Sequence, residues 1–269
     1  ELPIDLRIAI EQELKSLSTQ ELAKVVTKLS NRYRAGRATE GMSFVTTTDE
    51  ATAYAAFRLP ATYAAIYSVL KEVKTKFPDW CPETLLDVGA GPGPVMWAAN
   101  ESELWPHSFR QITLLEREPA MMALGKRLAS YAPKAPIREA QWYLVDVTQR
   151  WPTVPHDLVV TSYVLGELSL DSQEAFLAQL WEMTNHTLVI IEPGTPVGFA
   201  CVKEAREKLL ALGGKIVAPC PHDNQCPIAG DDWCHFAQRV TRSRLHRQAK
   251  AGELGYEDEK FSYIAISRE

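Results

Sequence analysis

A glycine-rich segment follows a short apolar run in the first half of the chain. The run Leu85–Val88 contains one acidic residue, Asp87, and glycines occupy positions 89, 91 and 93 directly after it. Glycine has no Cβ, so its backbone adopts positive φ and lets a ligand approach closely. The segment therefore predicts a ligand-binding loop between a strand and a helix. Dinucleotide-binding proteins use a similar loop, so the glycines alone do not identify the ligand.

The residues around the loop favour a ligand without phosphate. Pro92 and Pro94 remove two amide donors from the place where a pyrophosphate would bind. An acidic residue at position 87 instead suits a cationic ligand, such as the amino-acid end of S-adenosylmethionine. The alternative is that Asp87 only caps a helix or forms a turn, which is a frequent role of Asp.

Two further acidic residues follow later apolar runs. Glu116 ends the run that begins at Gln111, where a carboxylate accepts hydrogen bonds from ribose hydroxyls. Asp146 follows the run that begins at Gln141, where a carboxylate would hold an adenine amino group. As alternatives, Glu116 is a solvated surface acid and Asp146 starts a turn. The predicted cofactor site is made of Asp87, Gly89, Ala90, Gly91, Pro92, Gly93, Glu116, Arg117, Asp146, Val147 and Tyr163.

The fourth apolar run is followed by Tyr163 and Glu167. Enzymes that methylate exocyclic amines commonly have an Asn/Asp-Pro-Pro-aromatic loop here, and this chain does not. Tyr163 is a candidate to stack on a base or to pack on the cofactor, and Glu167 is a candidate general base or helix cap. The sequence therefore predicts no catalytic residue and leaves the methyl acceptor open.

Three of the five cysteines, Cys220, Cys226 and Cys234, fall within fifteen residues. Thiolates bind zinc or iron–sulfur clusters, and four ligands are the rule for both. His222 and His235 are candidates for a fourth ligand. Ordinary buried cysteines and a nucleophilic Cys220 are the alternatives. The polar surroundings of the three thiols favour a metal site.

Short apolar runs alternate with helical stretches from Thr84 onward. This order indicates βαβ units, and so an α/β fold with a doubly wound, mostly parallel sheet covered by helices on both faces. With the glycine loop, the pattern predicts a Rossmann-like class I S-adenosylmethionine-dependent methyltransferase fold. Strands are expected at Leu85–Val88, Gln111–Leu115, Gln141–Val145, Asp157–Thr161, Thr187–Ile191 and Phe261–Ile266, and helices from near Pro94, Pro119, Asp171 and Val197.

A helical N-terminal region is expected over residues 1–80, before a methyltransferase-like domain over residues 81–269. Apolar residues at helical spacing predict two helices between residues 4 and 34, with Ser18 and Glu21 capping the second. Pro60 predicts the end or a kink of a further helix, which would resume near Thr62. A Cys-rich, metal-binding insertion is expected at about 215–255, because more residues lie there than a crossover needs.

The chain is acidic overall and basic in one place. Its 269 residues are 46% apolar, enough for one large core, and the net charge of -5 does not indicate general polyanion binding. Five cations without an acidic neighbour lie between Asp232 and Glu253, and on a helix or tight loop they would contact phosphates. A solvated helix face is the alternative. These cations are Arg239, Arg242, Arg244, Arg247 and Lys250, and Arg32, Arg34 and Arg37 form a weaker group.

Targeting signals do not occur in the sequence as given. No segment reads as a signal peptide, a transit peptide or a membrane-spanning run of about 20 apolar residues. We therefore expect a cytoplasmic, monomeric protein without a membrane partner. The sequence does not begin with Met and stops after a strand-like run, so we expect it to be a fragment.

Four segments of the chain support a family resemblance. They are Tyr54–Tyr63, Asp87–Gly93, Ile191–Pro196 and Pro219–Phe236, of which the glycine loop is generic and the cysteine block is specific. In these segments the chain resembles the small-ribosomal-subunit methyltransferase-like family, known for mitochondrial ribosome assembly factors and with bacterial relatives. The resemblance runs from about residue 50 to the end.

The resemblance implies a partner and a second cofactor. The partner is the small ribosomal subunit with its RNA, and eukaryotic relatives are expected in mitochondria. The second cofactor is a 4Fe-4S cluster held by four cysteines, with zinc as the alternative metal. Three of those positions match Cys220, Cys226 and Cys234, and the fourth is implied beyond the strand at Phe261–Ile266, where this sequence ends.

We therefore expect an S-adenosylmethionine-dependent methyltransferase, or a methyltransferase-like factor, that acts on small-subunit ribosomal RNA or in ribosome assembly. Methyl transfer needs mainly in-line positioning, so the lack of an obvious catalytic pair does not exclude an enzyme. Two alternatives stay open. One is a catalytically silent RNA-binding assembly factor, and the other is a small-molecule methyltransferase.

Overall fold

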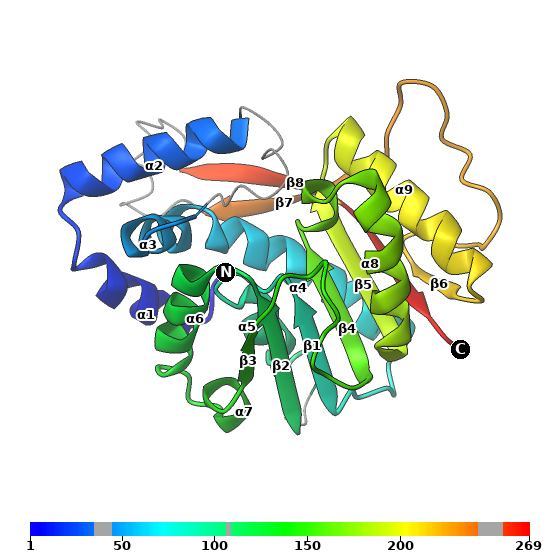
Figure 1. Ribbon diagram of the computed structural model, residues 1–269, viewed down its shortest axis with the longest axis horizontal. Coiled ribbons are helices and arrows are strands. Elements are labelled where there is room, and N and C mark those ends of the chain that lie inside the picture. The colour runs from blue at the N-terminus through cyan, green and yellow to red at the C-terminus, as the bar shows by residue number, and fades with distance from the viewer. Residues whose placement is uncertain (35–44, 106–108, 242–254) are drawn as a thin grey trace.

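The computed structural model describes residues 1–34, 45–105, 109–241 and 255–269. At its centre is an eight-stranded sheet in the order β3-β2-β1-β4-β5-β8-β6, with β7 paired to β8 (Figure 1). β1 to β5 run parallel, and β8 runs antiparallel to β5, β6 and β7. The predicted α/β fold with a mostly parallel sheet is confirmed. The strands are β1 Thr84–Val88, β2 Gln111–Glu116, β3 Gln141–Leu144, β4 His156–Ser162, β5 Thr184–Pro193, β6 Lys215–Ala218, β7 Phe236–Thr241 and β8 Tyr256–Ser267.

Helices cover both faces of the sheet. Side chains alternate along β1, so Leu85 points to one face and Leu86 to the other, and both are fully buried. Leu85 packs in one core with side chains of α1 to α6, whereas Leu86 packs in a second core with α8 and α9, which lie side by side next to β5 (Figure 1). The helices are α1 Ile4–Leu14, α2 Thr19–Arg34, α3 Thr48–Phe57, α4 Leu59–Lys76, α5 Pro94–Ala99, α6 Pro119–Ala129, α7 Ala135–Arg138, α8 Leu170–Glu182 and α9 Pro196–Ala211, with the 3-10 helix η1 at Leu165–Glu167.

The N-terminal helices begin where their capping residues favour it. The Ser18 N–H donates to the Glu21 carboxylate at 2.9 Å and the Glu21 N–H donates to Ser18 Oγ at 3.2 Å, so the predicted capping of α2 is confirmed. The predicted break between two helices is confirmed, but it lies at Arg58 and not at Pro60, because α3 ends at Phe57 and Pro60 lies in the first turn of α4. A proline in the first turn loses no helical hydrogen bond, so it starts this helix instead of ending one.

Two strands lie in the predicted insertion without having been expected. A helix or tight loop was expected after Cys234, and this was wrong for residues 236–241. They form strand β7, which alternates half-buried and exposed side chains and pairs with β8. Within this pair Arg239 lies 2.9 Å from the Asp258 carboxylate and 4.1 Å from the centre of the Tyr256 ring. Arg239 is therefore paired within the two strands β7 and β8. The remaining cations of that basic group, Arg242, Arg244, Arg247 and Lys250, lie outside the described residues, as does Arg37.

Helix α4 joins the N-terminal helices to the sheet. Ile66 and Leu70 of α4 are fully buried in the same core as Leu85 of β1 and Leu6 of α1. The elements that surround the carboxyl ends of the strands therefore share one packed interior. Within the described ranges, no helix is both long and apolar enough to cross a bilayer.

Candidate cofactor site

Three glycines turn the chain from β1 into α5. Gly89, Gly91 and Gly93 have φ values of 74°, 54° and 83°, which lie in the left-handed region that favours glycine. At Gly89 a Cβ would also lie 2.3 Å from Cγ2 of Val164, so a side chain does not fit. The Gly89 N–H donates to the carbonyl of Leu115 at 2.9 Å and ties the loop to β2. The segment has the open, side-chain-free backbone that a ligand-binding loop needs.

Asp87 lies at the end of β1, directly before the loop, and is fully buried. Among the described residues, neither oxygen of its carboxylate has a hydrogen-bond partner. Burial raises the pKa of Asp87 well above its usual value, and the charge of Glu116 raises it further. A buried carboxyl group without a partner is unfavourable for folding, and Asp87 makes no hydrogen bond of the kind that a turn former or helix cap makes.

Glu116 ends β2 beside the loop and is only 6% exposed, so it is not a solvated surface acid. One carboxylate oxygen accepts from the Gly91 N–H at 2.6 Å and the other from the Glu118 N–H at 2.7 Å. Burial raises the pKa of Glu116, and these backbone hydrogen bonds lower it. Each carboxylate oxygen has two lone pairs, so one remains on each for a ligand hydroxyl.

Asp146 has a different environment. Its side chain is exposed and accepts from the N–H and the hydroxyl of Thr148 at 2.9 and 2.8 Å. The bond from the Thr148 N–H is the main reason that the pKa of Asp146 is lowered. These contacts are those of a turn former, the alternative that the sequence left open.

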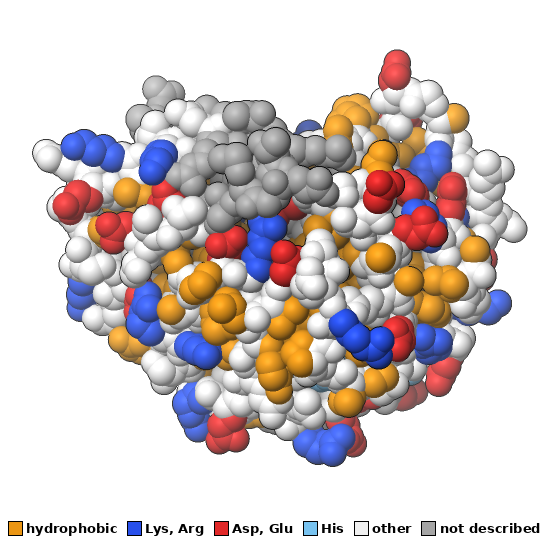
Figure 2. Space-filling view, in the orientation of Figure 1, with side chains coloured by type: hydrophobic (Ala, Val, Ile, Leu, Met, Phe, Trp, Pro, Cys, Tyr) orange, Lys and Arg blue, Asp and Glu red, His pale blue; other side chains and the backbone are white. Residues whose placement is uncertain are grey.

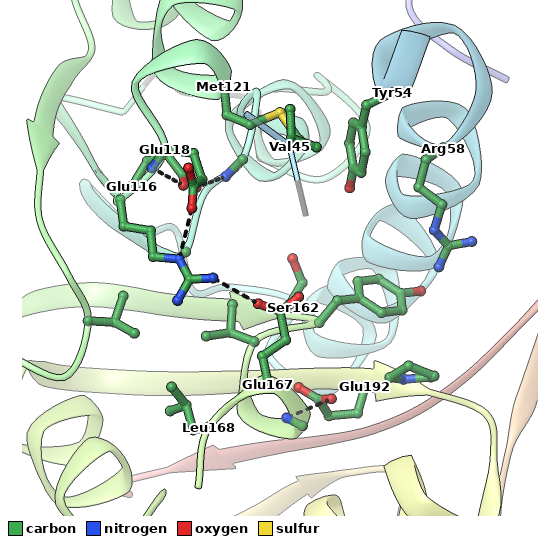
Figure 3. A pocket seen from close by; sticks show the side chains of 18 of the residues that line it. Val45, Tyr54, Arg58, Glu116, Glu118, Met121, Ser162, Glu167, Leu168 and Glu192 are labelled. Carbon is green, nitrogen blue, oxygen red and sulfur yellow. Dashed lines mark hydrogen bonds and ion pairs between the residues drawn. The ribbon is translucent and has the colours of Figure 1, made fainter. Parts of the chain in front are cut away.

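A cavity of about 490 Å³ opens at the carboxyl ends of the central strands, where ligands of doubly wound sheets bind. Figure 2 shows apolar side chains gathered along a hollow on this face, next to charged ones. Tyr54 of α3 and Arg58, which directly follows this helix, close one side of the cavity (Figure 3). Of the predicted site, the cavity is lined by Gly89, Gly91, Glu116, Arg117, Val147 and Tyr163, and not by Asp87, Ala90, Pro92, Gly93 or Asp146.

Arg117 lines the cavity and contacts two acidic side chains. Its Nε is 3.1 Å from the carboxylate of Glu118, and its Nη2 is 3.9 Å from the carboxylate of Glu167. Burial raises the pKa of Glu167 to about 7, although the charge of Arg117 lowers it. Arg117 is thus engaged by carboxylates and is not an open site for phosphate.

A second arginine of the cavity pairs with an acid from the other end of the chain. The two terminal nitrogens of Arg58 each donate to the Glu259 carboxylate at 2.7 Å, and the Tyr163 hydroxyl donates to the same carboxylate at 2.9 Å. The guanidinium of Arg58 lies 5.1 Å from the centre of the Tyr163 ring. In the part of the chain that the structure describes, Tyr163 is the non-glycine residue with positive φ, at 61°, which is a strained conformation often found at functional sites.

Glu192 is a further acid of the cavity, at the end of β5. It is 1% exposed and accepts from the N–H groups of Leu165 and Gly166 at 2.8 and 3.2 Å. Burial raises the pKa of Glu192 to about 8. The sequence prediction missed it, although it follows an apolar run just as Glu116 does. Tyr54, Phe57 and Arg58 were missed because no periodicity shows which helix will reach the strand ends.

The three clustered cysteines lie between β6 and β7 as half-buried free thiols. Across the ranges that the structure describes, no group of three or more His, Cys, Asp or Glu side chains is arranged to hold a metal ion. The ligand set predicted from Cys220, Cys226 and Cys234 is therefore not assembled. Burial raises the pKa of Cys234, and the charges of the other two thiols add to this. The candidate fourth ligand His235 stacks against Trp233, with 5.4 Å between the ring centres.

Comparison with known sequences gives a family match over most of the chain. The family described as mitochondrial small ribosomal subunit Rsm22 matches residues 48–269. The mitochondrial ribosome assembly protein METTL17 of Homo sapiens is 32% identical over 247 residues, which cover 86% of this chain and 50% of that protein. The mitochondrial Rsm22-cox11 tandem protein 2 of Schizosaccharomyces pombe is 27% identical over 248 residues, which cover 80% of this chain and 31% of that protein. The chain thus spans half the length of the human relative, and less of the yeast one.

Solved structures share the fold. The magnesium protoporphyrin IX methyltransferase of Synechocystis with bound SAH superposes with a TM-score of 0.50 at 12% identity, covering 89% of this chain and 93% of that one. At this identity the likeness is one of fold. It agrees with the class I methyltransferase architecture expected from the glycine loop and the order of strands.

Proposed function

The chain belongs to the family described as mitochondrial small ribosomal subunit Rsm22, and on this premise we propose that it binds S-adenosylmethionine in the strand-end cavity. We propose further that it acts on the small ribosomal subunit, as an RNA methyltransferase or a methyltransferase-like assembly factor. The names of its relatives place those proteins in mitochondria. For this chain, we propose that it acts in the compartment in which the small ribosomal subunits that it binds are assembled.

The acidic lining of the cavity is the observation on which the cofactor proposal rests. Four glutamates line the cavity, and Asp87 is buried directly before the loop without a partner. Both arginines of the lining, Arg58 and Arg117, are already paired with carboxylates. A pyrophosphate would meet these carboxylates without a free cation to bind. A cationic nucleoside without phosphate fits them, because opposite charges attract and ribose hydroxyls find acceptors.

The residues have separate tasks in this proposal. Glu116 accepts hydrogen bonds from the ribose, and the glycine loop, which directly follows the buried Asp87, receives the amino-acid end. Val147 packs against the adenine, and Asp146 would have to leave its turn with Thr148 to bind the adenine amino group. When bound, S-adenosylmethionine would supply an electrophilic methyl group.

Calorimetry with three ligands tests the cofactor proposal. We expect S-adenosylmethionine and S-adenosylhomocysteine to bind, and NAD to give no heat of binding. Binding of NAD without binding of either methionine derivative would overturn the proposal. Because the chain is titrated without RNA, the result does not depend on the identity of the methyl acceptor.

The relative named as a ribosome assembly protein favours a second candidate, a factor that binds the subunit without methylating it. Purified chain, tritiated S-adenosylmethionine and bare small ribosomal subunits separate the two. Label in the RNA supports the enzyme. Cofactor binding and subunit binding without label support the assembly factor, and labelling of small molecules but not RNA supports the small-molecule methyltransferase.

We propose an iron–sulfur cluster at the cysteine block, on the basis of the three free thiols and the family resemblance. The described residues do not form a preassembled site, so the segment must close around the metal and gain a further ligand. Protein purified without oxygen is expected to be brown, with visible thiolate-to-iron absorption. A colourless protein that contains zinc would contradict this proposal and leave the cofactor cavity unaffected.

A further inference from the structure

Glu167 is the acidic side chain of the cavity that is left uncommitted. Glu116 and Glu192 each accept two backbone hydrogen bonds, and Glu118 lies 3.1 Å from Arg117. In the part of the chain that the structure describes, the carboxylate of Glu167 has one charged contact, to Arg117 at 3.9 Å. Its oxygens are therefore available to accept a proton.

The side chain of Glu167 lines the cavity just after the tip of β4. It ends η1, directly after β4, and β4 pairs with β1, the strand that leads into the glycine loop. Glu167 and Gly89 line the same cavity, and Figure 3 shows its side chain rising beside Ser162 at the tip of β4. The side chain is 36% exposed, so a substrate that enters the cavity reaches it.

The surroundings of Glu167 bring its pKa close to neutral pH. Its charged neighbours are Arg117, which favours the ionised form, and Glu116, Glu118 and Glu192, which disfavour it. Burial is the largest cause that raises the pKa of Glu167 to about 7; the charge of Arg117 opposes it, and the charges of Glu116 and Glu118 add to it. A general base works best when its pKa lies close to the working pH.

We propose that Glu167 is the general base of the site and accepts the proton that an N–H or O–H methyl acceptor loses. The inference rests on the proposed function and names the acceptor class. In the step, the acceptor nitrogen or oxygen bonds to the methyl carbon while the carbon–sulfur bond breaks and sulfur keeps its electron pair. The proton of the acceptor passes to Glu167, so atoms and charge balance.

Other polar groups of the cavity do not fit this role. The Tyr163 hydroxyl already donates to Glu259, and Glu192 is buried with both oxygens engaged. Asp87 does not line the cavity. Glu167 thus combines access, free lone pairs and proximity to the loop.

Proton release on cofactor binding tests the inference without a known acceptor. A sulfonium bound at the loop lowers the pKa of a nearby carboxyl by about one unit or more. Calorimetry in two buffers of different ionisation enthalpy should then show release of roughly 0.4 proton per S-adenosylmethionine at pH 7. S-adenosylhomocysteine, whose sulfur is neutral, should release much less. Release should decline at pH 5 and pH 9, where the carboxyl is fully protonated or fully ionised.

Glu167→Gln decides the outcome, with Glu174→Gln on the exposed face of α8 as the matched control. We expect Glu167→Gln to bind both ligands without the extra proton, and the control to behave as wild type. An unchanged proton count in Glu167→Gln would overturn the inference and leave the proposed function standing. Lack of S-adenosylmethionine binding by the wild type would instead overturn the proposed function and the inference together.

Methylation of small subunits, if it is observed, gives a second test. The rate with Glu167→Gln should then fall about 100-fold or more and lose its pH dependence near 7. An unchanged rate would overturn the inference.

Discussion

Asp87 is the residue at which stability and ligand binding are most directly opposed. Its carboxyl is fully buried, and none of the described residues donates a hydrogen bond to it. Burial, together with the charge of Glu116, raises the pKa of Asp87 and so favours its neutral form in the folded chain, whereas the unfolded chain ionises it above about pH 4. A cationic ligand nearby would favour the ionised form, so we expect the unfavourable burial of Asp87 to strengthen binding of such a ligand.

Asp87→Asn should separate these two effects. Because the folded pKa is raised, folding of the wild type takes up a proton, and its stability falls as pH rises above the unfolded pKa. Asparagine does not titrate, so the variant should gain on the wild type by up to about 1.4 kcal/mol per pH unit. Urea unfolding without ligand at pH 5, 6.5 and 8 measures the gap. S-adenosylmethionine affinity should fall by roughly tenfold or more. A gap that does not change with pH would contradict the account.

Gly89→Ala tests the loop by adding one methyl group. A Cβ at this position meets Val164 at 2.3 Å and also forces φ of 74° on an L-residue. Gly213→Ala is the matched control, since its φ is 88° and nothing lies within 4 Å of the added atom. The control should lose about 1 to 2 kcal/mol of stability and keep cofactor affinity. Gly89→Ala should lose more stability and most of its affinity in calorimetry, and equal behaviour of the two variants would refute the steric argument.

At the scale of elements, the break between α3 and α4 connects the N-terminal helices to the strand ends. Arg58 at this break pairs with Glu259 of β8, and Glu259 also accepts from Tyr163 after β4. Three elements therefore meet at one carboxylate. The strained backbone of Tyr163 is held by this contact and by its N–H, which donates to Ile191 at 2.8 Å.

Arg58→Met should destabilise the chain by about 2 to 3 kcal/mol. The change leaves Glu259, which is 9% exposed, without its cation, and the usual cost of breaking a buried pair is reduced because Arg58 is partly exposed. Arg58→Met combined with Glu259→Gln should cost at least about 1 kcal/mol less than the sum of the single changes. Urea unfolding of the four proteins measures this coupling.

Arg239→Met provides the control for that cycle. Arg239 of β7 pairs with Asp258, which lies next to Glu259 in β8. Their side chains are 63% and 41% exposed, so solvent screens the pair. We expect no measurable loss of stability from this variant. A loss equal to that of Arg58→Met would mean that burial does not distinguish the two ion pairs.

The elements predicted from sequence are those whose burial alone determines their pattern. β1 and β2 are buried on both faces and therefore have apolar sequences. The start of α2 was predicted from its capping residues Ser18 and Glu21. β6 has four residues and β7 alternates on an open edge, so neither gives a run that separates it from a loop. The break between α3 and α4 was predicted at Pro60 and lies at Arg58, because proline stops a helix interior but is accepted in a first turn.

Site residues divide in a similar way. The rule that an acid at a strand end faces the ligand selected Asp87, Glu116 and Asp146 alike. The structure buries the first two, of which Glu116 lines the cavity, and it exposes Asp146, which bonds to Thr148. Sequence does not reveal burial, and burial separates these acids. Arg58 and Glu259 are 201 positions apart, so only the fold brings them together.

At the scale of the whole molecule, the helical region and the sheet share one interior. Leu70 of α4 and Leu85 of β1 are fully buried in the same core, which also contains Leu6 of α1. Burial of this kind couples elements, since removing one side chain exposes or loosens the others. We infer that the N-terminal helices and the central strands unfold as one cooperative unit, even though residues 1–80 and 81–269 differ in pattern.

Leu70→Ala tests that cooperativity by hydrogen exchange. The substitution leaves a cavity in the shared core and should lower the free energy of unfolding by about 3 kcal/mol. If α4, β1 and β4 open together, their slowest amides should all lose protection by this same amount. Leu170→Ala, at a side chain that is 65% exposed, should leave every segment unchanged. Loss of protection in α4 with β1 and β4 unaffected would show two independent units, and the cavity wall formed by Tyr54 and Arg58 would then open without unfolding of the sheet.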